Sequence, residues 1–402
     1  MKSNQSVWLA STILLSLLLT VAIPVPGVAE DKAQRPAQHR YNVIDLGTLP
    51  GGNFSQPFVI TSNGVVSGSS NLPDNSQHAV LWYGGRMKDL GTLGGLNSIA
   101  FGVNAYGETV GEAESSASDP NGEDFCGFGT HLICLPTLWQ GGKPNALPTL
   151  GGNNGVVNRN NNWGFAVGWA ETSKDDPACP APQKLHFKAV AWADGFPIEL
   201  PSKNGDPDGI ALGINDYGDI VGSSGICSTF NPNLLFSLQG EHALLWQNGK
   251  VVDLGNLGGT TGQAFGNLAF AINNRGQVVG GSDLSGDTSF HAFLWTKAKH
   301  MQDLGTLSGD VDSAAIAINE HGVVVGLSID ASGNTRAFVW QNGAMTDLNT
   351  LVQSNPPLYL LTGCSINSHG DITGLGATST GEIHTYLAVP DTLEESSIGG
   401  RQ

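Results

Sequence analysis

The chain has 402 residues, a formal net charge of −17 and 55 glycines, and only 13% of its residues are charged. This acidity, without any cluster of Lys and Arg, excludes a phosphate-binding surface for nucleic acid. The 40% of apolar residues exclude intrinsic disorder, and the many glycines favour short strands and tight turns over long helices.

The N-terminus has the features of a secretory signal peptide. Lys2 supplies a positive charge, residues 7–23 are almost all apolar, and Gly27-Val28-Ala29 offers small residues for cleavage. We expect a signal peptide over residues 1–29, a polar leader over 30–40, and a secreted protein, extracellular or periplasmic. An uncleaved anchor is the alternative, because the apolar run is slightly long for a signal. No other stretch is long and apolar enough to cross a bilayer.

From residue 41 onward a four-segment unit recurs, and each segment has the composition of a strand. The segments are rich in Val, Ile, Phe and Trp and are bounded by Gly and Asn. In one copy, segment A ends in Ile-Asn (272–273), B is Gly-x-Val-Val-Gly (276–280), C is His-Ala-Phe-Leu-Trp (291–295), and D is Met-x-Asp-Leu-Gly-Thr-Leu (301–307).

The glycine pair of segment B fixes the number of units. It occurs seven times, as Gly64/Gly68, Gly107/Gly111, Gly164/Gly168, Gly218/Gly222, Gly276/Gly280, Gly322/Gly326 and Gly370/Gly374. Four strands in each unit of roughly 40–60 residues indicate the blade of a β-propeller. The sequence therefore predicts an all-β fold, a seven-bladed propeller with four-stranded antiparallel blades.

The two ends of the repeat region predict how the ring closes. The region begins with a lone D segment (41–49) and ends with A, B and C segments (361–367, 370–374 and 384–388) that have no D of their own. The N-terminal strand can complete the last blade, and closure removes two exposed sheet edges. We expect one propeller domain over residues 41–390 and a disordered tail over 391–402.

Five cysteines fit an oxidising compartment. Four allow three pairings; we favour Cys126 with Cys134, which are close in sequence, and Cys179 with Cys227, which lie in comparable insertions of neighbouring units. Cys364 is left as a buried small hydrophobe.

Long insertions fall on one side of the predicted ring. The B–C connections are long in blades 2, 3 and 4 (residues 112–134, 170–187 and 223–241), whereas the A–B and C–D turns are short throughout. Because binding residues concentrate on loops displayed by a rigid scaffold, we expect the site on the face that carries these insertions. Ligand-contact candidates are Trp169, which lies outside the repeat pattern, and the loop residues Asn53, Asn153, Asp310 and Asp312.

We expect side chains that recur at the same position of the repeat to have structural roles. Segment C begins with a histidine, which we expect to hydrogen-bond within its blade, and ends with a core tryptophan; the aspartates of segment D are expected to accept turn amides. These sets are His78, His242, His291 and His384; Trp82, Trp139, Trp192, Trp246, Trp295 and Trp340; and Asp45, Asp89, Asp253, Asp303 and Asp347.

One segment has partial calcium-loop spacing. Asn204, Asp206 and Asp208 alternate their side-chain oxygens, with Gly209 in the sixth position. The twelfth position is Asn215 rather than Glu, so calcium at these three residues is a hypothesis, and no other cofactor is predicted.

The pattern formed by His-Ala-Phe, Asp-Leu-Gly-Thr-Leu-Gly-Gly, Ile-Asn and Gly-x-Val-Val-Gly resembles the HAF repeat family of probable extracellular bacterial proteins. The match is clearest over residues 253–295 and 303–340, and it covers nearly all of 41–389. The resemblance implies export and a repeat fold, with no established activity.

The chain lacks a nucleophile elbow, a phosphate loop and a His-Glu-x-x-His motif, so a non-catalytic role is favoured. The leading expectation is a monomeric secreted propeller that binds an extracellular protein or glycan through its loop-rich face. The rival is an extracellular hydrolase or lyase acting on a polymer, with Asp175, Asp176, Asp310 and Asp312 at the channel mouth. A third is a structural envelope component.

Overall fold

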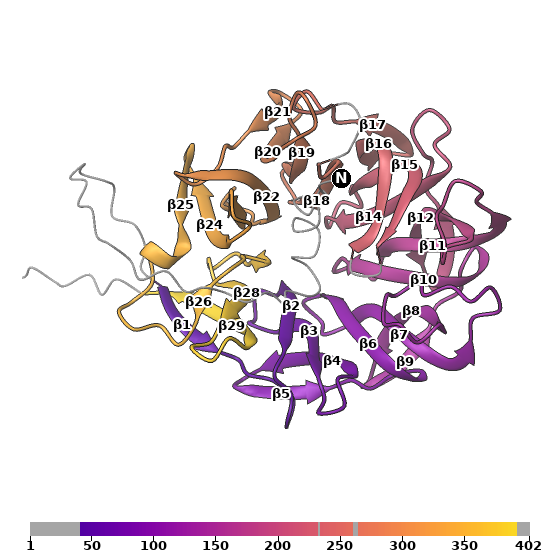
Figure 1. Cartoon of the computed structure of the whole chain (residues 1–402), viewed down its shortest axis with the longest axis horizontal. Coiled ribbons are helices and arrows are strands. Elements are labelled where there is room, and N and C mark those ends of the chain that lie inside the picture. The colour runs from indigo at the N-terminus through magenta and orange to yellow at the C-terminus, as the bar shows by residue number, and fades with distance from the viewer. Residues whose placement is uncertain (1–40, 232–233, 260–263, 392–402) are drawn as a thin grey trace, which may run out of the picture.

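The computed structural model describes residues 41–231, 234–259 and 264–391, and it shows an all-β protein (Figure 1). Seven antiparallel sheets, each of four strand positions, stand around a central axis as the blades of a propeller. The predicted fold class is thereby confirmed. The predicted signal peptide and leader, and the tail beyond Asp391, lie outside the described residues.

Blades 1 to 6 each contain four consecutive strands, with the first strand nearest the axis. Blade 1 is β2 (Ser55–Ile60), β3 (Val66–Asn71), β4 (Gln77–Tyr83) and β5 (Arg86–Asp89); blade 2 is β6 (Gly94–Val103), β7 (Thr109–Ser118), β8 (Leu132–Gln140) and β9 (Lys143–Ala146); blade 3 is β10 (Gly151–Asn160), β11 (Ala166–Asp175), β12 (Leu185–Ala193) and β13 (Phe196–Glu199).

Blade 4 is β14 (Asp208–Ile214), β15 (Ile220–Asn231), β16 (Leu234–Gln247) and β17 (Lys250–Asp253); blade 5 is β18 (Asn267–Ile272), β19 (Val278–Asp283), β20 (Phe290–Thr296) and β21 (His300–Asp303); blade 6 is β22 (Asp310–Ile318), β23 (Val324–Asp330), β24 (Thr335–Gln341) and β25 (Ala344–Asp347). A single 3₁₀ turn (Leu348–Thr350) follows blade 6 in the described part of the chain.

Blade 7 closes the ring with both ends of the chain. Its inner strand is split into β26 (Tyr359–Leu360) and β27 (Ser365–Ile366), followed by β28 (Ile372–Ala377) and β29 (Ile383–Pro390). The outermost strand is β1 (Tyr41–Asp45), which pairs antiparallel with β29 so that Tyr41 lies opposite Pro390 and Asp45 opposite Tyr386. The predicted closure by the N-terminal strand is therefore confirmed.

The repeated glycine pair has a steric cause at both of its positions. The first glycine ends the A–B turn with a positive φ, between 70° and 86° in the seven blades, where residues with a Cβ are strained. The second lies where a Cβ would overlap the backbone carbonyl of the adjacent inner strand, as at Gly222 against Ile210. In blades 1 to 6 the inner strand has a register shift near this point.

The blades pack face to face, so both faces of each sheet are covered. Val221 and Leu245 of blade 4, for example, form one buried cluster with Ala269, Val278 and Phe293 of blade 5. This explains why the segments are apolar at nearly every position. Of the repeated tryptophans predicted to be core, five are buried and Trp340 packs half-buried against such a cluster; the buried five are Trp82, Trp139, Trp192, Trp246 and Trp295.

A hydrogen-bonded row of asparagines joins neighbouring A–B turns. In each turn the asparagine Oδ1 accepts backbone N–H groups two and four residues on, and its Nδ2 donates to the backbone carbonyl at the same position of the next blade. These side chains are Asn104, Asn161, Asn215, Asn273, Asn319 and Asn367, and the donated bonds measure 3.0–3.2 Å. Thr61 takes this position in blade 1, and its hydroxyl bonds within its own turn.

No helix among the described residues is long and apolar enough to span a membrane.

Candidate functional site

The two rims of the propeller are built differently. On one rim the B–C connections of blades 2, 3 and 4 project beyond the ring, and much of what the sequence suggested as loop is strand. In blade 4, β15 and β16 pair along the insertion as far as Asn231, which lies opposite Leu234. The insertions of blades 2 and 3 contact each other, because the Lys184 and Leu185 amides donate to Oε1 of Glu123.

Two disulfides stabilise this loop-rich rim, as predicted. Cys126 pairs with Cys134 inside the blade 2 insertion, and Cys179 pairs with Cys227 across blades 3 and 4. The fifth cysteine, Cys364, is buried as a free thiol. Two disulfides are consistent with an oxidising, extracellular compartment.

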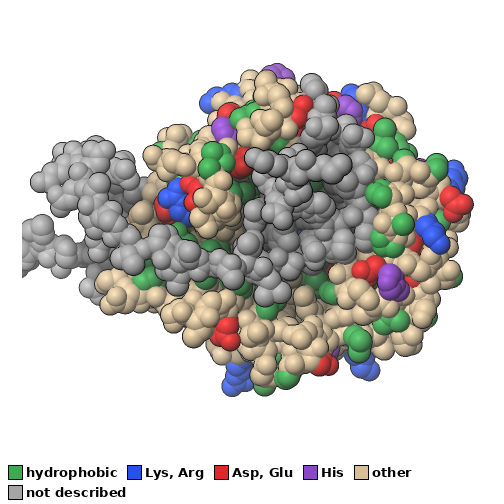
Figure 2. Space-filling model, viewed as in Figure 1, with side chains coloured by type: hydrophobic (Ala, Val, Ile, Leu, Met, Phe, Trp, Pro, Cys, Tyr) green, Lys and Arg blue, Asp and Glu red, His purple; other side chains and the backbone are tan. Residues whose placement is uncertain are grey.

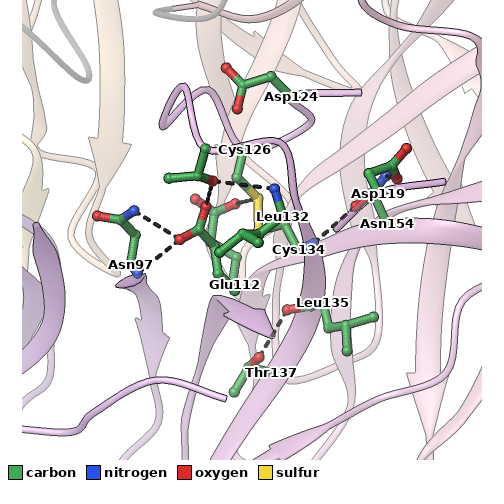
Figure 3. Close-up of a disulfide and its surroundings, with 12 residues drawn as sticks. Asn97, Glu112, Asp119, Asp124, Cys126, Leu132, Cys134, Leu135, Thr137 and Asn154 are labelled. Atoms are coloured by element: carbon green, nitrogen blue, oxygen red, sulfur yellow. Dashed lines mark hydrogen bonds between the residues drawn. A yellow bond between two sulfur atoms is a disulfide. The ribbon is translucent and has the colours of Figure 1, made fainter. Parts of the chain in front are cut away.

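Figure 3 shows an acidic side chain beside the first disulfide. The Glu112 carboxyl is fully buried, and one of its oxygens lies 3.0 Å from Sγ of Cys126. A disulfide sulfur carries no proton to donate. Burial raises the pKa of the Glu112 carboxyl well above its ordinary value, and the nearby Glu114 adds to this effect.

Further buried carboxylates beneath this rim hold loop amides. Oε2 of Glu171 accepts the Asn153 and Asn154 backbone N–H groups at 3.1 and 3.0 Å. Asp283 does the same in blade 5 for Phe265 and Gly266. Burial, followed by the charge of Glu123, raises the pKa of Glu171 to about 8. These acids anchor the D–A connections and have structural roles.

The expected histidine and aspartate roles are also structural. Nδ1 of His78 lies 2.8 Å from Asp89, and the equivalent pair in blade 5, His291 and Asp303, is 2.9 Å apart. The Asp89 carboxylate also accepts the Gly91 amide at 2.8 Å. The same histidine–aspartate pairing occurs at His242–Asp253 and His384–Asp45, and Arg336–Asp347 replaces it in blade 6.

Trp169 does not lie at the surface. Its side chain is 0% exposed, within the cluster that includes Phe101, Phe187 and the Cys126–Cys134 disulfide. The expectation that it contacts a ligand on the rim is therefore wrong. The insertions extend β11 and cover Trp169, which the sequence had suggested as the start of an open loop.

The other ligand candidates are scattered over blades 1, 3 and 6. Oδ1 of Asn53 accepts a hydrogen bond from Nδ2 of Asn71 at 2.8 Å, and the backbone N–H of Asn153 donates to Oε2 of Glu171. Asp310 pairs with Arg336 at 2.6 Å, and Asp312 accepts the Phe290 amide at 3.0 Å. Each has a partner within its own blade or in the adjacent one. The structure does not gather these side chains at one site.

The residues of the suggested calcium loop separate in the structure. Asn204 is exposed with φ +53°, and Asp206 accepts the Ser224 hydroxyl at 2.6 Å. Asp208 instead is buried beside His186 and Asp176. Burial and the Asp176 charge raise the pKa of Asp208 to about 6.

A cavity of about 220 Å³ occupies the channel, lined by the inner strands of all seven blades. Among the described residues, Arg159 is the one charged side chain that lines it. Nη1 of Arg159 donates to the carbonyls of Phe101 and Asn158 at 2.6 and 2.8 Å, and burial lowers its pKa to about 10. The same position in the other blades carries a smaller side chain, at Val59, Gly102, Gly213, Ala271, Ala317 and Ser365.

The opposite rim, formed by the A–B turns, carries an unexpected group of aromatic side chains. Tyr106, Trp163 and Tyr217 are 78%, 73% and 77% exposed. They occupy the same turn position in consecutive blades 2, 3 and 4, one residue before the positive-φ glycine. We call these three residues the aromatic row. Phe165, 44% exposed, flanks Trp163.

The turns that carry the aromatic row are held side by side by two sets of hydrogen bonds. The asparagine Nδ2 bonds join Asn104 to Asn161 and Asn161 to Asn215. One residue further on, the Ala105 amide donates to Asn162, and the Asn162 amide donates to Asp216. The backbone under the aromatic row is thus fixed before any ligand arrives, which lowers the entropic cost of binding.

The sequence contained the signal for the aromatic row. Three consecutive units have an aromatic residue between the turn asparagine and its glycine, whereas the corresponding residues of the other blades are Asn63, Arg275, His321 and His369. Insertion length does not reveal this signal, because the turns that carry it are short.

Comparison with known proteins identifies no family. No family model and no curated protein matches the chain, so its resemblance to HAF repeat proteins stays a prediction. Two solved structures are similar at low levels: a polysaccharide lyase, PL25 ulvan lyase bound to a GlcA(1-4)Rha3S ligand, and a mutant of AofleA from Arthrobotrys oligospora. The first has 11% identity and a TM-score of 0.42, over 88% of this chain and 97% of that one. The second has 10% identity and a TM-score of 0.34, over 87% and 88%. At these values the likeness carries no argument about function.

Proposed function

We propose that this protein is a secreted glycan-binding propeller that contacts a neutral polysaccharide through the aromatic row. The observation that carries the proposal is the exposure of Tyr106, Trp163 and Tyr217 at one position of three adjacent turns. Large exposed aromatic side chains at a rigid surface are typical of recognition sites.

The surroundings of the aromatic row favour a sugar polymer over a protein partner. A protein interface has a contiguous apolar centre, whereas here each ring stands on its own turn, separated by polar groups such as Asn162 and Asp216. A sugar ring offers an apolar C–H face for stacking and hydroxyl groups at its edge for those polar neighbours. Three equivalent platforms in sequence suit a ligand that is itself a repeat.

The net charge supports a neutral glycan. At −17 the protein repels polyanions at long range, and Glu108, Asp216 and Asp219 lie in or beside the turns that carry the aromatic row. We therefore expect an uncharged polysaccharide in preference to a sulfated or uronic-acid polymer.

The test begins with the mature protein on an array of neutral and acidic polysaccharides, followed by titration calorimetry with an oligosaccharide of the best ligand. Trp163→Ala removes the central stacking platform and should weaken binding roughly five- to thirtyfold, since loss of one stacked ring costs about 1–2 kcal/mol. Trp163→Phe should retain part of the affinity.

The matched control is His321→Ala, which changes the same turn position in blade 6, outside the aromatic row. Its affinity should equal that of the parent. Because these side chains are exposed, the substitutions should leave stability nearly unchanged. Binding only to polyanions, or equal loss in His321→Ala and Trp163→Ala, would contradict the proposal.

The loop-rich rim is a second candidate surface, for a protein partner. The cross-blade disulfide and the contact of Glu123 with the blade 3 insertion make it a rigid, shaped projection. The rival enzymatic function has less support, because Asp310 and Asp312 are engaged by Arg336 and the Phe290 amide.

A further inference from the structure

We infer that Asp176, His186 and Asp208 form a binding site for one divalent transition-metal ion, with Zn²⁺ as the representative. The inference is independent of glycan binding, since the three residues lie on the loop-rich rim, away from the aromatic row. Asp176 follows β11, His186 lies at the start of β12, and Asp208 begins β14 of the next blade.

The three potential ligand atoms converge. Nδ1 of His186 lies 3.1 Å from Oδ1 of Asp208 and 3.4 Å from Oδ2 of Asp176, and each of the three residues offers a ligand atom within 4.8 Å of those of the other two. Ligands bound about 2.1 Å from a tetrahedral zinc stand about 3.4 Å apart. An ion can therefore be accommodated with small side-chain adjustments, and its remaining positions would hold water.

The cluster has more negative charge than its own residues neutralise. The side chains of Asp176 and Asp208 are 1% and 0% exposed, and one imidazolium at most stands between them. Oδ2 of Asp176 accepts no hydrogen bond from the described residues. Buried carboxylates are held by partners or metals, and a dication would supply what this oxygen lacks.

Only one member of the cluster has a role that the repeat explains. Oδ1 of Asp208 accepts the Phe187 amide, as Asp312 accepts the Phe290 amide two blades on. His186 lies two residues before the repeat position of the pairing histidines, which is Lys188 in this blade, and Asp176 belongs to the insertion. His186 and Asp176 therefore do not belong to the repeated pattern of the blades.

The surroundings hold the carboxylates in place. The Cys179–Cys227 disulfide links the insertion that carries Asp176 to β15, the strand that pairs with β14, and the Cys227 amide donates to Oδ2 of Asp208 at 3.2 Å. His186, at 22% side-chain exposure, leaves an entry path from solvent. The imidazole nitrogen favours zinc and its neighbours over Ca²⁺, which takes oxygen ligands.

The experiment is a calorimetric titration of Zn²⁺ into chelator-treated mature protein with its disulfides intact. The absorption spectrum of bound Co²⁺ gives a second readout of the ligands. The expected result is one ion per chain. His186→Gln and Asp176→Asn should each weaken Zn²⁺ binding at least tenfold and lose the Co²⁺ spectrum. Zn²⁺ should raise the melting temperature of the parent but not of His186→Gln.

The controls are His78→Gln, which removes a repeat histidine paired with a single aspartate, and Asp206→Asn in the suggested calcium loop. Both should bind Zn²⁺ as the parent does. Absence of Zn²⁺ binding, or binding unchanged in His186→Gln, would show that the cluster is only a hydrogen-bonded triad and would overturn the inference. Ca²⁺ binding lost in Asp206→Asn, with no Zn²⁺ binding, would overturn it in favour of the calcium loop.

Discussion

Single polar side chains at repeat positions join the blades. In each A–B turn one asparagine satisfies its own turn through Oδ1 and reaches the next blade through Nδ2, as Asn215 does toward Asn273. A buried hydrogen bond of this kind contributes about 1 kcal/mol, and six such bonds follow one another around the ring. The step from blade 1 to blade 2, where Thr61 stands, is the exception.

Thr61→Asn should complete this series. The new Nδ2 can donate to the Asn104 carbonyl, and the new Oδ1 can accept the Val65 amide that the threonine hydroxyl now holds. We expect the free energy of unfolding to rise by about 1 kcal/mol in urea denaturation. Thr61→Ala, which removes the hydroxyl and adds no bond, should be less stable than the parent. A Thr61→Asn protein no more stable than the parent would show that the bond does not form.

Buried acids beneath the loop-rich rim predict a pH dependence of stability. Burial raises the pKa of Glu171 from 4.5 to about 8 and that of Glu112 well above its ordinary value. Between pH 4.5 and 8 the unfolded chain loses the Glu171 proton while the folded protein keeps it. The contribution of Glu171 to stability must therefore be greatest at and below pH 4.5. It must fall as the pH rises to about 8.

For Glu171 alone the fall amounts to roughly 2–4 kcal/mol between pH 4.5 and 8. Glu171→Gln should remove this part of the slope, because a glutamine can still accept the Asn153 and Asn154 amides. Denaturation at a series of pH values measures it. An unchanged slope in Glu171→Gln would mean that Glu171 is ionised in the folded protein.

At the scale of the strand, close contact between segments A and B explains the repeat. The second glycine of each pair lies against a carbonyl of the inner strand, and this contact recurs in all seven blades. A side chain there would push the innermost strand toward the channel. Because this contact requires glycine in every blade, the number of glycine pairs in the sequence gives the number of blades.

Gly222→Ala should therefore destabilise the protein by roughly 2–3 kcal/mol, because its Cβ would overlap the Ile210 carbonyl. Gly209→Ala, in the neighbouring strand of the same blade, is the matched control. A Cβ at Gly209 would lie 3.3 Å from the nearest atom, the Ser223 carbonyl, so the cost should be much smaller. Equal losses in chemical denaturation would refute this explanation of the repeat.

Two tryptophans six residues apart show what strand-level patterns could and could not predict. Trp163 occupies a tight turn and is 73% exposed, while Trp169 in β11 is fully buried by the insertions of blades 2 and 3. The repeat predicted the strands and the closure, and the positions of the cysteines predicted the disulfides. It could not show which side chains the insertions would cover, because those insertions follow no repeat and their packing is tertiary.

At the scale of the whole molecule, ring closure brings distant residues together. Asp208 comes to lie beside Asp176 and His186 only when blade 4 packs against blade 3, and no motif spacing in the sequence predicts this contact. The aromatic row likewise exists only because blades 2, 3 and 4 stand side by side around the axis (Figure 1). The space-filling view in Figure 2 shows acidic and basic side chains distributed around the described part of the visible face, without a basic patch there.

The most direct test of the account is hydrogen–deuterium exchange of the propeller with and without its best polysaccharide ligand. Binding through the aromatic row should slow exchange in the A–B turns at residues 104–108, 161–165 and 215–219 and leave the insertions of blades 2 to 4 unchanged. Protection confined to those insertions, with exchange of the three turns unaltered, would contradict it.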